Sequence, residues 1–173
     1  MNDIFEEKIK YNDILYDLNL NTLFNAIRDK KKEFVKKILL EDPSLMKNIN
    51  IDGWGAIHYC AAYGNKDIMK MLIEEFNSNI NETTDDYNTP SIIAATKFNI
   101  SCLIELMKHN ADISLTNRSD LNVMDLLAEC SHELKVIINN NIDDTMHLEF
   151  VNDNFKLVGD NTEYNIKNIL FKI

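Results

Sequence analysis

The sequence predicts an all-α solenoid of stacked helix-turn-helix repeats, followed by a small C-terminal β-hairpin extension. Three observations predict it: a motif that recurs every 33 or 34 residues, apolar positions with helical spacing inside each copy, and alternating apolar residues near the C-terminus. The chain has 173 residues, 45% of them hydrophobic and 27% charged. This composition is ordinary for a globular protein that buries a core.

The first helix of each repeat is indicated by four segments that align. They are "NTLFNAIRDKK" from Asn21, "GAIHYCAAYGN" from Gly55, "TPSIIAATKFN" from Thr89 and "NVMDLLAECSH" from Asn122, with starts 34, 34 and 33 residues apart. A small residue recurs at one position of the first three copies: Ala26, Cys60 and Ala94. We expect these small residues to let the helices of neighbouring copies approach closely.

The second helix of each repeat is indicated by apolar residues at positions i, i+1, i+4 and i+5, which lie on one helical face. Three copies fill this pattern completely: Phe34, Val35, Ile38 and Leu39; Ile68, Met69, Leu72 and Ile73; Cys102, Leu103, Leu106 and Met107. The fourth copy keeps a looser version in Leu134, Ile137 and Ile138. No copy can bury its apolar face alone, so stacking must form the core.

The layout "DGWGAIHYCAAYGNKDIMKMLIEE", together with Thr89-Pro90 and "NADIS" at 110–114, resembles the ankyrin repeat family over about residues 20–141. The resemblance implies four ankyrin repeats that bind a partner through their loop tips and the inner face of their first helices. The chain also departs from the family pattern. The loop glycine is replaced by Tyr87 and Asp120, and the glycine between the helices by Lys30, Phe98 and Ser131. Because bulky residues are strained at positive φ, we expect altered turns in the third copy.

Both ends lie outside the repeats, which gives three regions: a cap at 1–19, the array at 20–141 and an extension at 142–173. The first region reads as an amphipathic helix, with apolar residues at Ile4, Phe5, Ile9, Ile14, Leu15 and Leu18. In the extension, "MHLEFVNDNFKLV" alternates apolar residues around "NDN" and predicts a β-hairpin at 146–158. An isolated two-stranded hairpin is only marginally stable, so this one should pack on the array, on a partner, or on a second copy of the chain. The last arrangement would make the protein a homodimer.

Catalytic, cofactor and metal sites are not expected. His58 and Cys60 suggest a nucleophilic pair, but residues at i and i+2 of one helix do not face each other. The resemblance instead implies that His58 braces the neighbouring loop and that Cys60 is a buried small residue. Cys130 and His132 lack the second ligand pair that zinc needs, and four glycines hardly make a phosphate loop.

Charge and targeting signals restrict the partner and the compartment. The net charge of −10 argues against a general nucleic-acid binder and favours basic partners. Three scattered cysteines favour a reducing compartment. The longest stretch without charged residues, 53–65, is too short to span a bilayer, and the acidic N-terminus does not resemble a signal peptide. We therefore expect a cytoplasmic or nuclear protein that does not bind membranes.

The function predicted from these observations is a non-enzymatic protein-protein interaction module. Residues at loop tips and inner helix positions are the candidate partner-binding set: Arg28, Asp52, Trp54, Tyr63, Asp85, Asp86, Asn88 and Leu121. Trp54, Tyr63, Asp85 and Asp86 are expected to share one groove for a Lys- or Arg-containing segment. The segment 28–37 is basic and reads either as a solvated helix face or as a docking patch for an acidic segment or phosphates. An alternative function is that of a regulatory or targeting region of an enzyme complex. A third and weaker alternative is an enzyme whose active site lies in the C-terminal extension.

Overall fold

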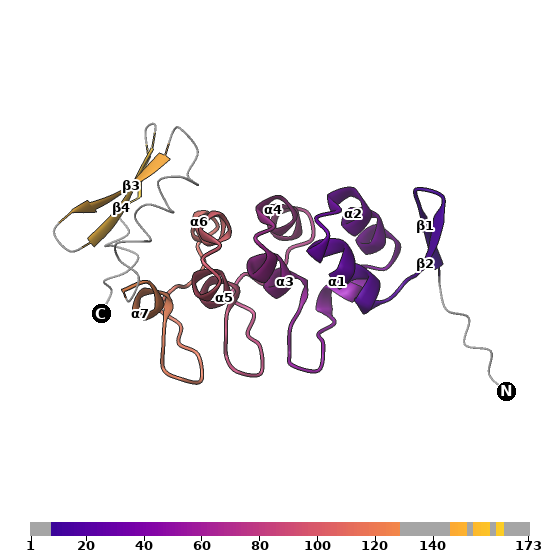
Figure 1. Ribbon diagram of the computed structural model, residues 1–173, viewed down its shortest axis with the longest axis horizontal. Helices are drawn as coiled ribbons and strands as arrows, with labels where there is room; N and C mark the ends of the chain where they lie inside the picture. The colour runs from indigo at the N-terminus through magenta and orange to yellow at the C-terminus, as the bar shows by residue number, and fades with distance from the viewer. Residues whose placement is uncertain (1–7, 129–145, 152–153, 160–161, 165–173) are drawn as a thin grey trace.

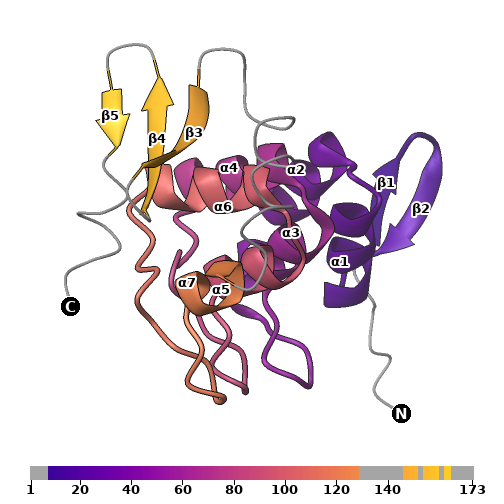
Figure 2. The ribbon, with the colours of Figure 1, turned by 60° about the vertical axis from the view of Figure 1, so that its left-hand side comes forward.

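The helices form two parallel rows. The computed structural model describes residues 8–128, 146–151, 154–159 and 162–164. Figure 1 shows α2, α4 and α6 in one row and α1, α3, α5 and α7 in the other, with long loops that project beyond the second row. Figure 2 shows that three of these loops, those before α3, α5 and α7, project from the same side of the array.

Three helical hairpins follow one another in sequence order, and a fourth begins, as the repeat predicts. Their helices are α1 (Leu20–Arg28) and α2 (Lys32–Glu41), α3 (Ala56–Tyr63) and α4 (Lys66–Glu74), α5 (Pro90–Thr96) and α6 (Ile100–Lys108), and α7 (Val123–Ala128), with a 3-10 helix, η1 (Pro43–Lys47), after α2. The helix expected around Leu134, Ile137 and Ile138 lies outside the described residues. In the described part of the chain, no helix combines the length and the apolar character needed to cross a membrane.

The core lies between the two rows and runs through all the repeats. The small residues Ala26, Cys60 and Ala94 are buried where α1, α3 and α5 pack on one another, as expected from their size. The apolar faces of α2, α4 and α6 are buried against the row of α1, α3 and α5, with Ile38, Leu72 and Leu106 fully enclosed. Each repeat thus completes the core of its neighbours, which is how a solenoid gains stability.

The turns of the third copy are not altered, so that prediction is wrong. Phe98 between the helices has φ +55° and Tyr87 in the loop has φ +59°, close to the +68° and +76° of Gly64 and Gly53 in the preceding copy. Hydrogen bonds hold both turns: the Phe98 N–H donates to Ala95 O and the Tyr87 N–H to Thr84 O. The shared repeat geometry therefore overrides the local preference, at a strain cost of about 1–2 kcal/mol per residue.

The N-terminal cap is a β-hairpin and not the predicted helix. Strands β1 (Lys8–Tyr11) and β2 (Ile14–Asp17) pair antiparallel around Asn12 and Asp13, both at positive φ. Asn and Asp are the residues that tolerate such a two-residue turn best after Gly. Ile9 is buried, and the rings of Tyr11 and Tyr16 lie 4.3 and 4.8 Å from that of Phe34 on α2. The hairpin therefore covers the end of the array.

The C-terminal extension contains three described strands. They are β3 (Met146–Val151), β4 (Asn154–Gly159) and β5 (Thr162–Tyr164). β3 pairs antiparallel with β4 from Met146↔Gly159 to Val151↔Asn154, and β4 pairs antiparallel with β5. The side chains of these strands are not among the described ones, so the expected burial of the apolar residues of the hairpin, on this chain or on another, stays a prediction.

Candidate partner-binding site

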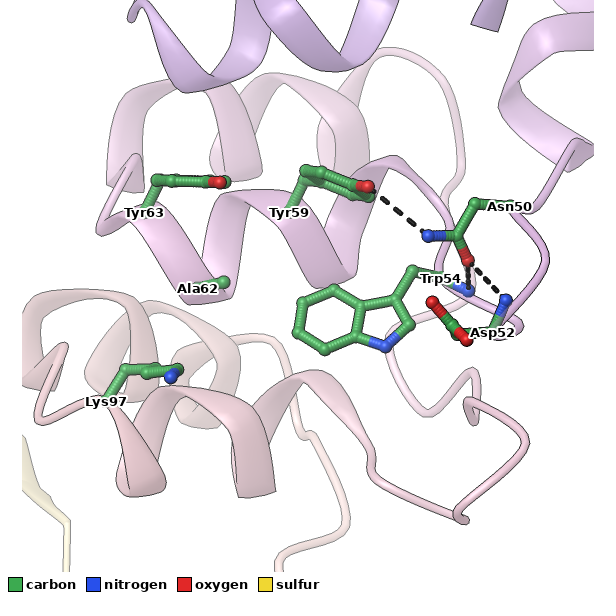
Figure 3. A pocket seen from close by; sticks show the side chains of 7 residues that line it. All are labelled: Asn50, Asp52, Trp54, Tyr59, Ala62, Tyr63 and Lys97. Atoms are coloured by element: carbon green, nitrogen blue, oxygen red, sulfur yellow. Dashed lines mark hydrogen bonds between the residues drawn. The ribbon is translucent and has the colours of Figure 1, made fainter. Parts of the chain in front are cut away.

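A pocket lies where the loop before α3 meets the inner helices. It has a volume of about 430 Å³, and the residues that line it come from the loop, from α3 and from the end of α5: Asn50, Asp52, Trp54, Tyr59, Ala62, Tyr63 and Lys97. Figure 3 shows the side chains of Trp54, Tyr59 and Tyr63 on one wall and Lys97 across from them. The structure thus brings together three predicted residues, Asp52, Trp54 and Tyr63.

Three aromatic rings form the apolar wall of the pocket. Tyr59 packs edge-on against Trp54 with ring centroids 5.7 Å apart, and its ring stacks with that of Tyr63 at 6.1 Å. On its other side Tyr59 stacks on the buried Phe24 of α1 at 4.0 Å. Tyr63 is 43% exposed and Trp54 is partly exposed, so apolar ring surface remains open to a ligand. Tyr59 is not among the residues predicted from the sequence, although it precedes Tyr63 by one helical turn and therefore shares its face.

The loop holds Trp54 in a fixed position. The Asn50 Oδ1 accepts hydrogen bonds from the backbone N–H groups of Asp52 and Trp54, each at 2.9 Å, and its Nδ2 donates to the Tyr59 hydroxyl at 3.3 Å. Gly53 completes the turn at φ +76°. Because these hydrogen bonds order the loop before any ligand binds, the entropic cost of binding is lower.

The charges at the pocket are mixed and not purely acidic. Asp52 and Lys97 are both exposed, and within the described residues neither takes part in a salt bridge. Asp85 and Asp86 do not line the pocket. Asp86 instead pairs with Arg118 at 3.2 Å, and Arg118 also donates to Asp85 O at 2.8 Å. The expected acidic rim is therefore reduced to Asp52.

Three other predicted residues lie away from the pocket. Asn88 braces its own loop, because its N–H donates to Thr84 Oγ1, and joins it to the next loop, because its Oδ1 accepts from Asn117 Nδ2 at 3.1 Å. Leu121 is 39% exposed on the third loop. Arg28 is exposed at the end of α1, where it pairs with the adjacent Asp29 at 3.2 Å.

The loop tips are joined to each other by backbone hydrogen bonds. The Asp85 N–H donates to Asp52 O at 3.3 Å, and the Arg118 N–H donates to Asp86 O at 2.9 Å. The same bond thus recurs between successive repeats. The tips therefore lie side by side, as expected, and present a continuous edge next to the pocket.

His58 and Cys60 have structural roles, as predicted. The buried His58 ring accepts the Gly55 N–H at Nδ1, and its Nε2 donates to Glu82 O in the next loop at 2.9 Å. Burial lowers the pKa of His58, which keeps the ring neutral. Burial also raises the pKa of Cys60 well above its ordinary value, so no thiolate is available. Cys130 and His132 lie outside the described residues.

Comparison with known proteins gives a family and several relatives. A family model described as ankyrin repeats (3 copies) matches residues 23–117. Ankyrin repeat and SOCS box protein 2 of Mus musculus is 25% identical over 100 residues, which are 58% of this chain and 16% of that protein. The protein of the same name from Homo sapiens is 28% identical over 97 residues, 56% of this chain and 15% of that protein. The chain thus spans only about a sixth of the length of these relatives.

Proposed function

The chain belongs to the ankyrin repeat family, and from this premise we propose that it binds a partner protein through its loop tips and inner helices, without catalysis. Ankyrin repeats are generally protein-protein interaction modules. One observation supports the location of the site: the pocket in which Trp54, Tyr59 and Tyr63 leave ring surface open on a pre-ordered loop. Trp and Tyr are favoured anchors at the centres of interfaces.

The proposed occupant is an apolar or aromatic side chain of a partner segment, seated against Trp54 and Tyr63. Asp52 on one side of the pocket favours a Lys or Arg next to the anchor, and Lys97 on the other side favours an acidic group. Such a mixed pattern fixes the direction in which a segment lies, because the reverse orientation places like charges together.

Differential capture tests this proposal. The whole chain, its Trp54→Ala variant and its Lys97→Glu variant are used as baits in lysate of the source cells, with Leu40→Ala as the matched control. Leu40 is 64% exposed on α2, far from the pocket lining. A partner that binds the parent and Leu40→Ala, and loses at least about tenfold in affinity for Trp54→Ala (~1.4 kcal/mol or more), supports the site. A partner that binds all four proteins equally shows that the site lies elsewhere.

A second candidate function is a regulatory or targeting region of an enzyme complex. Two facts about the relatives favour it: they are much longer than the matched region, and their names include a further element, a SOCS box. The same capture experiment distinguishes the two functions, since mass spectrometry shows whether the main partner is an enzyme. For both functions we propose a cytoplasmic or nuclear location, which imaging of a tagged chain checks.

The C-terminal extension is proposed to form a packed hairpin of β3 and β4. Strand pairing between Met146 and Gly159 provides the backbone for it. Without such packing, its alternating apolar residues would form an exposed apolar surface prone to aggregation. Packing across two chains would make the protein a homodimer, which light scattering measures directly.

A further inference from the structure

We propose that Glu74, Glu105 and His109 form a Zn²⁺ site that joins the second and third repeats. One ligand atom from each of these side chains lies within 4.8 Å of the others. The three residues lie on the row formed by α2, α4 and α6, here called the outer row, away from the aromatic pocket. The proposed ion would hold α4 against α6.

The three side chains come from two neighbouring helices. Glu105 on α6 and His109, the residue that ends this helix, are four positions apart and therefore lie on the same face. Glu74 is the last residue of α4. These helices contact each other and stand side by side in the outer row (Figure 1). Two ligands from one helix at i and i+4 are a recurring way to hold zinc.

The two distances from His109 to the carboxylates match the edges of a tetrahedral zinc site. His109 Nε2 lies 3.3 Å from Glu105 Oε1 and 3.6 Å from Glu74 Oε1. With metal-ligand bonds of about 2.0–2.2 Å, neighbouring ligands of a tetrahedron are about 3.3–3.6 Å apart. Without an ion, the 3.3 Å contact between His109 and Glu105 is a long hydrogen bond, because the mode for N–H···O bonds is about 2.9–3.0 Å.

The burial of Glu105 calls for a cation. Its side chain is only 7% exposed, and within the described residues its one salt-bridge partner is His109. Lys70 Nζ lies 3.8 Å from Glu74 Oε1, the oxygen that also faces His109, whereas Glu105 has no lysine or arginine partner among the described residues. A buried carboxylate is costly unless it is paired or coordinates a metal. Two carboxylates balance the charge of one divalent ion.

The ligand set favours zinc over magnesium or calcium. Three ligands that include an imidazole suit Zn²⁺, whereas Mg²⁺ and Ca²⁺ require six or more oxygen ligands. Glu74 is 47% exposed and His109 is 25% exposed, which gives the ion a way in and leaves room for water as the fourth ligand. Because the ligands belong to two repeats, we assign the ion a stabilising role and no catalytic one.

The experiment measures zinc binding to the whole chain, in a Cys130→Ser background that removes a competing thiol. Thermal unfolding and calorimetry are carried out with ZnCl₂, and the visible absorption of Co²⁺ reports tetrahedral coordination. Binding should stabilise the fold, and at a free Zn²⁺ concentration of about 100 times Kd the folding constant rises about 100-fold. Glu105→Gln and His109→Gln should lose more affinity than the roughly 10- to 100-fold typical of outer-shell changes.

The matched control is Glu75→Gln. Glu75 is exposed next to Glu74 but pairs with Lys36 at 2.6 Å, outside the cluster. Zinc should stabilise this variant as it does the parent, whereas Glu74→Gln should respond weakly. The proposal is overturned if zinc does not bind the parent, or if it binds His109→Gln as tightly as the parent.

Discussion

The substitution Gly64→Ala tests how two neighbouring repeats are coupled. Gly64 ends α3 at φ +68°, and an added Cβ would lie 2.9 Å from the Asn99 Oδ1 of the next repeat. The amide of Asn99 is not free to move away. Its Nδ2 donates to Ala61 O at 2.7 Å and to Ala62 O at 2.9 Å, two carbonyls in the last turn of α3. The substitution therefore acts on the backbone of one repeat and on the side chain of the next.

The expected cost has two parts. Placing alanine in the left-handed region costs about 1–2 kcal/mol. Displacing the Asn99 amide loses up to two hydrogen bonds, at about 0.5–1.5 kcal/mol each. The free energy of unfolding should therefore fall by about 2–4 kcal/mol. With Asn99→Ala already present, only the first part remains, so the coupling between the two positions should be about 1 kcal/mol or more.

Equilibrium unfolding in urea of the parent, the two single variants and the double variant gives this coupling as a double-mutant cycle. Phe98 offers an internal comparison, because a bulky residue already occupies the same turn one repeat later at φ +55°. If Gly64→Ala costs the same with and without Asn99, the displaced amide is not the cause. The contact between the two repeats then has no part in requiring glycine.

Three further predictions concern the turns, pH and the extension. Lys30 is exposed and has φ +57°, so Lys30→Gly should remove backbone strain and raise the free energy of unfolding, measured in urea, by about 0.5–1 kcal/mol. A fall in the free energy of unfolding would show that Lys30 is not strained. The pKa of His58 lies below 6.5 in the folded chain, so its contribution is complete above about pH 6.5 and is lost as the pH falls towards the lower folded value. His58→Gln should therefore lower the free energy of unfolding most near pH ~8 and progressively less in acid. The raised pKa of Glu82 affects the parent and the variant alike and cancels in their difference. A loss of stability independent of pH would contradict the role of the neutral His58 ring. Removal of residues 143–173 should lower the melting temperature or halve the mass in light scattering, and no change in either would refute packing of the hairpin.

The sequence by itself determined the repeat and its core. Helical spacing of apolar residues and recurring small residues such as Ala26 and Ala94 are local patterns, and stacking is the one arrangement that buries them all. The i, i+2 spacing of His58 and Cys60 already argued against a catalytic pair, and the resemblance to ankyrin repeats implied that His58 braces the neighbouring loop. The helix predicted for the N-terminal region is wrong, because the turn at Asn12 and Asp13 and the contact with Phe34 select a hairpin.

Only the tertiary structure decided which side chains of neighbouring repeats contact each other. Phe98 keeps a glycine-like turn because Asn99 bonds to the preceding repeat, and this contact spans 38 residues of sequence. Lys97 meets Trp54 in one pocket, while Arg118 draws Asp86 into an ion pair outside it. Glu74 and Glu105, 31 residues apart, face the same histidine. The physical reason is the same in each case: periodicity fixes which face of a helix is buried, but stacking of neighbouring repeats sets which exposed side chains meet.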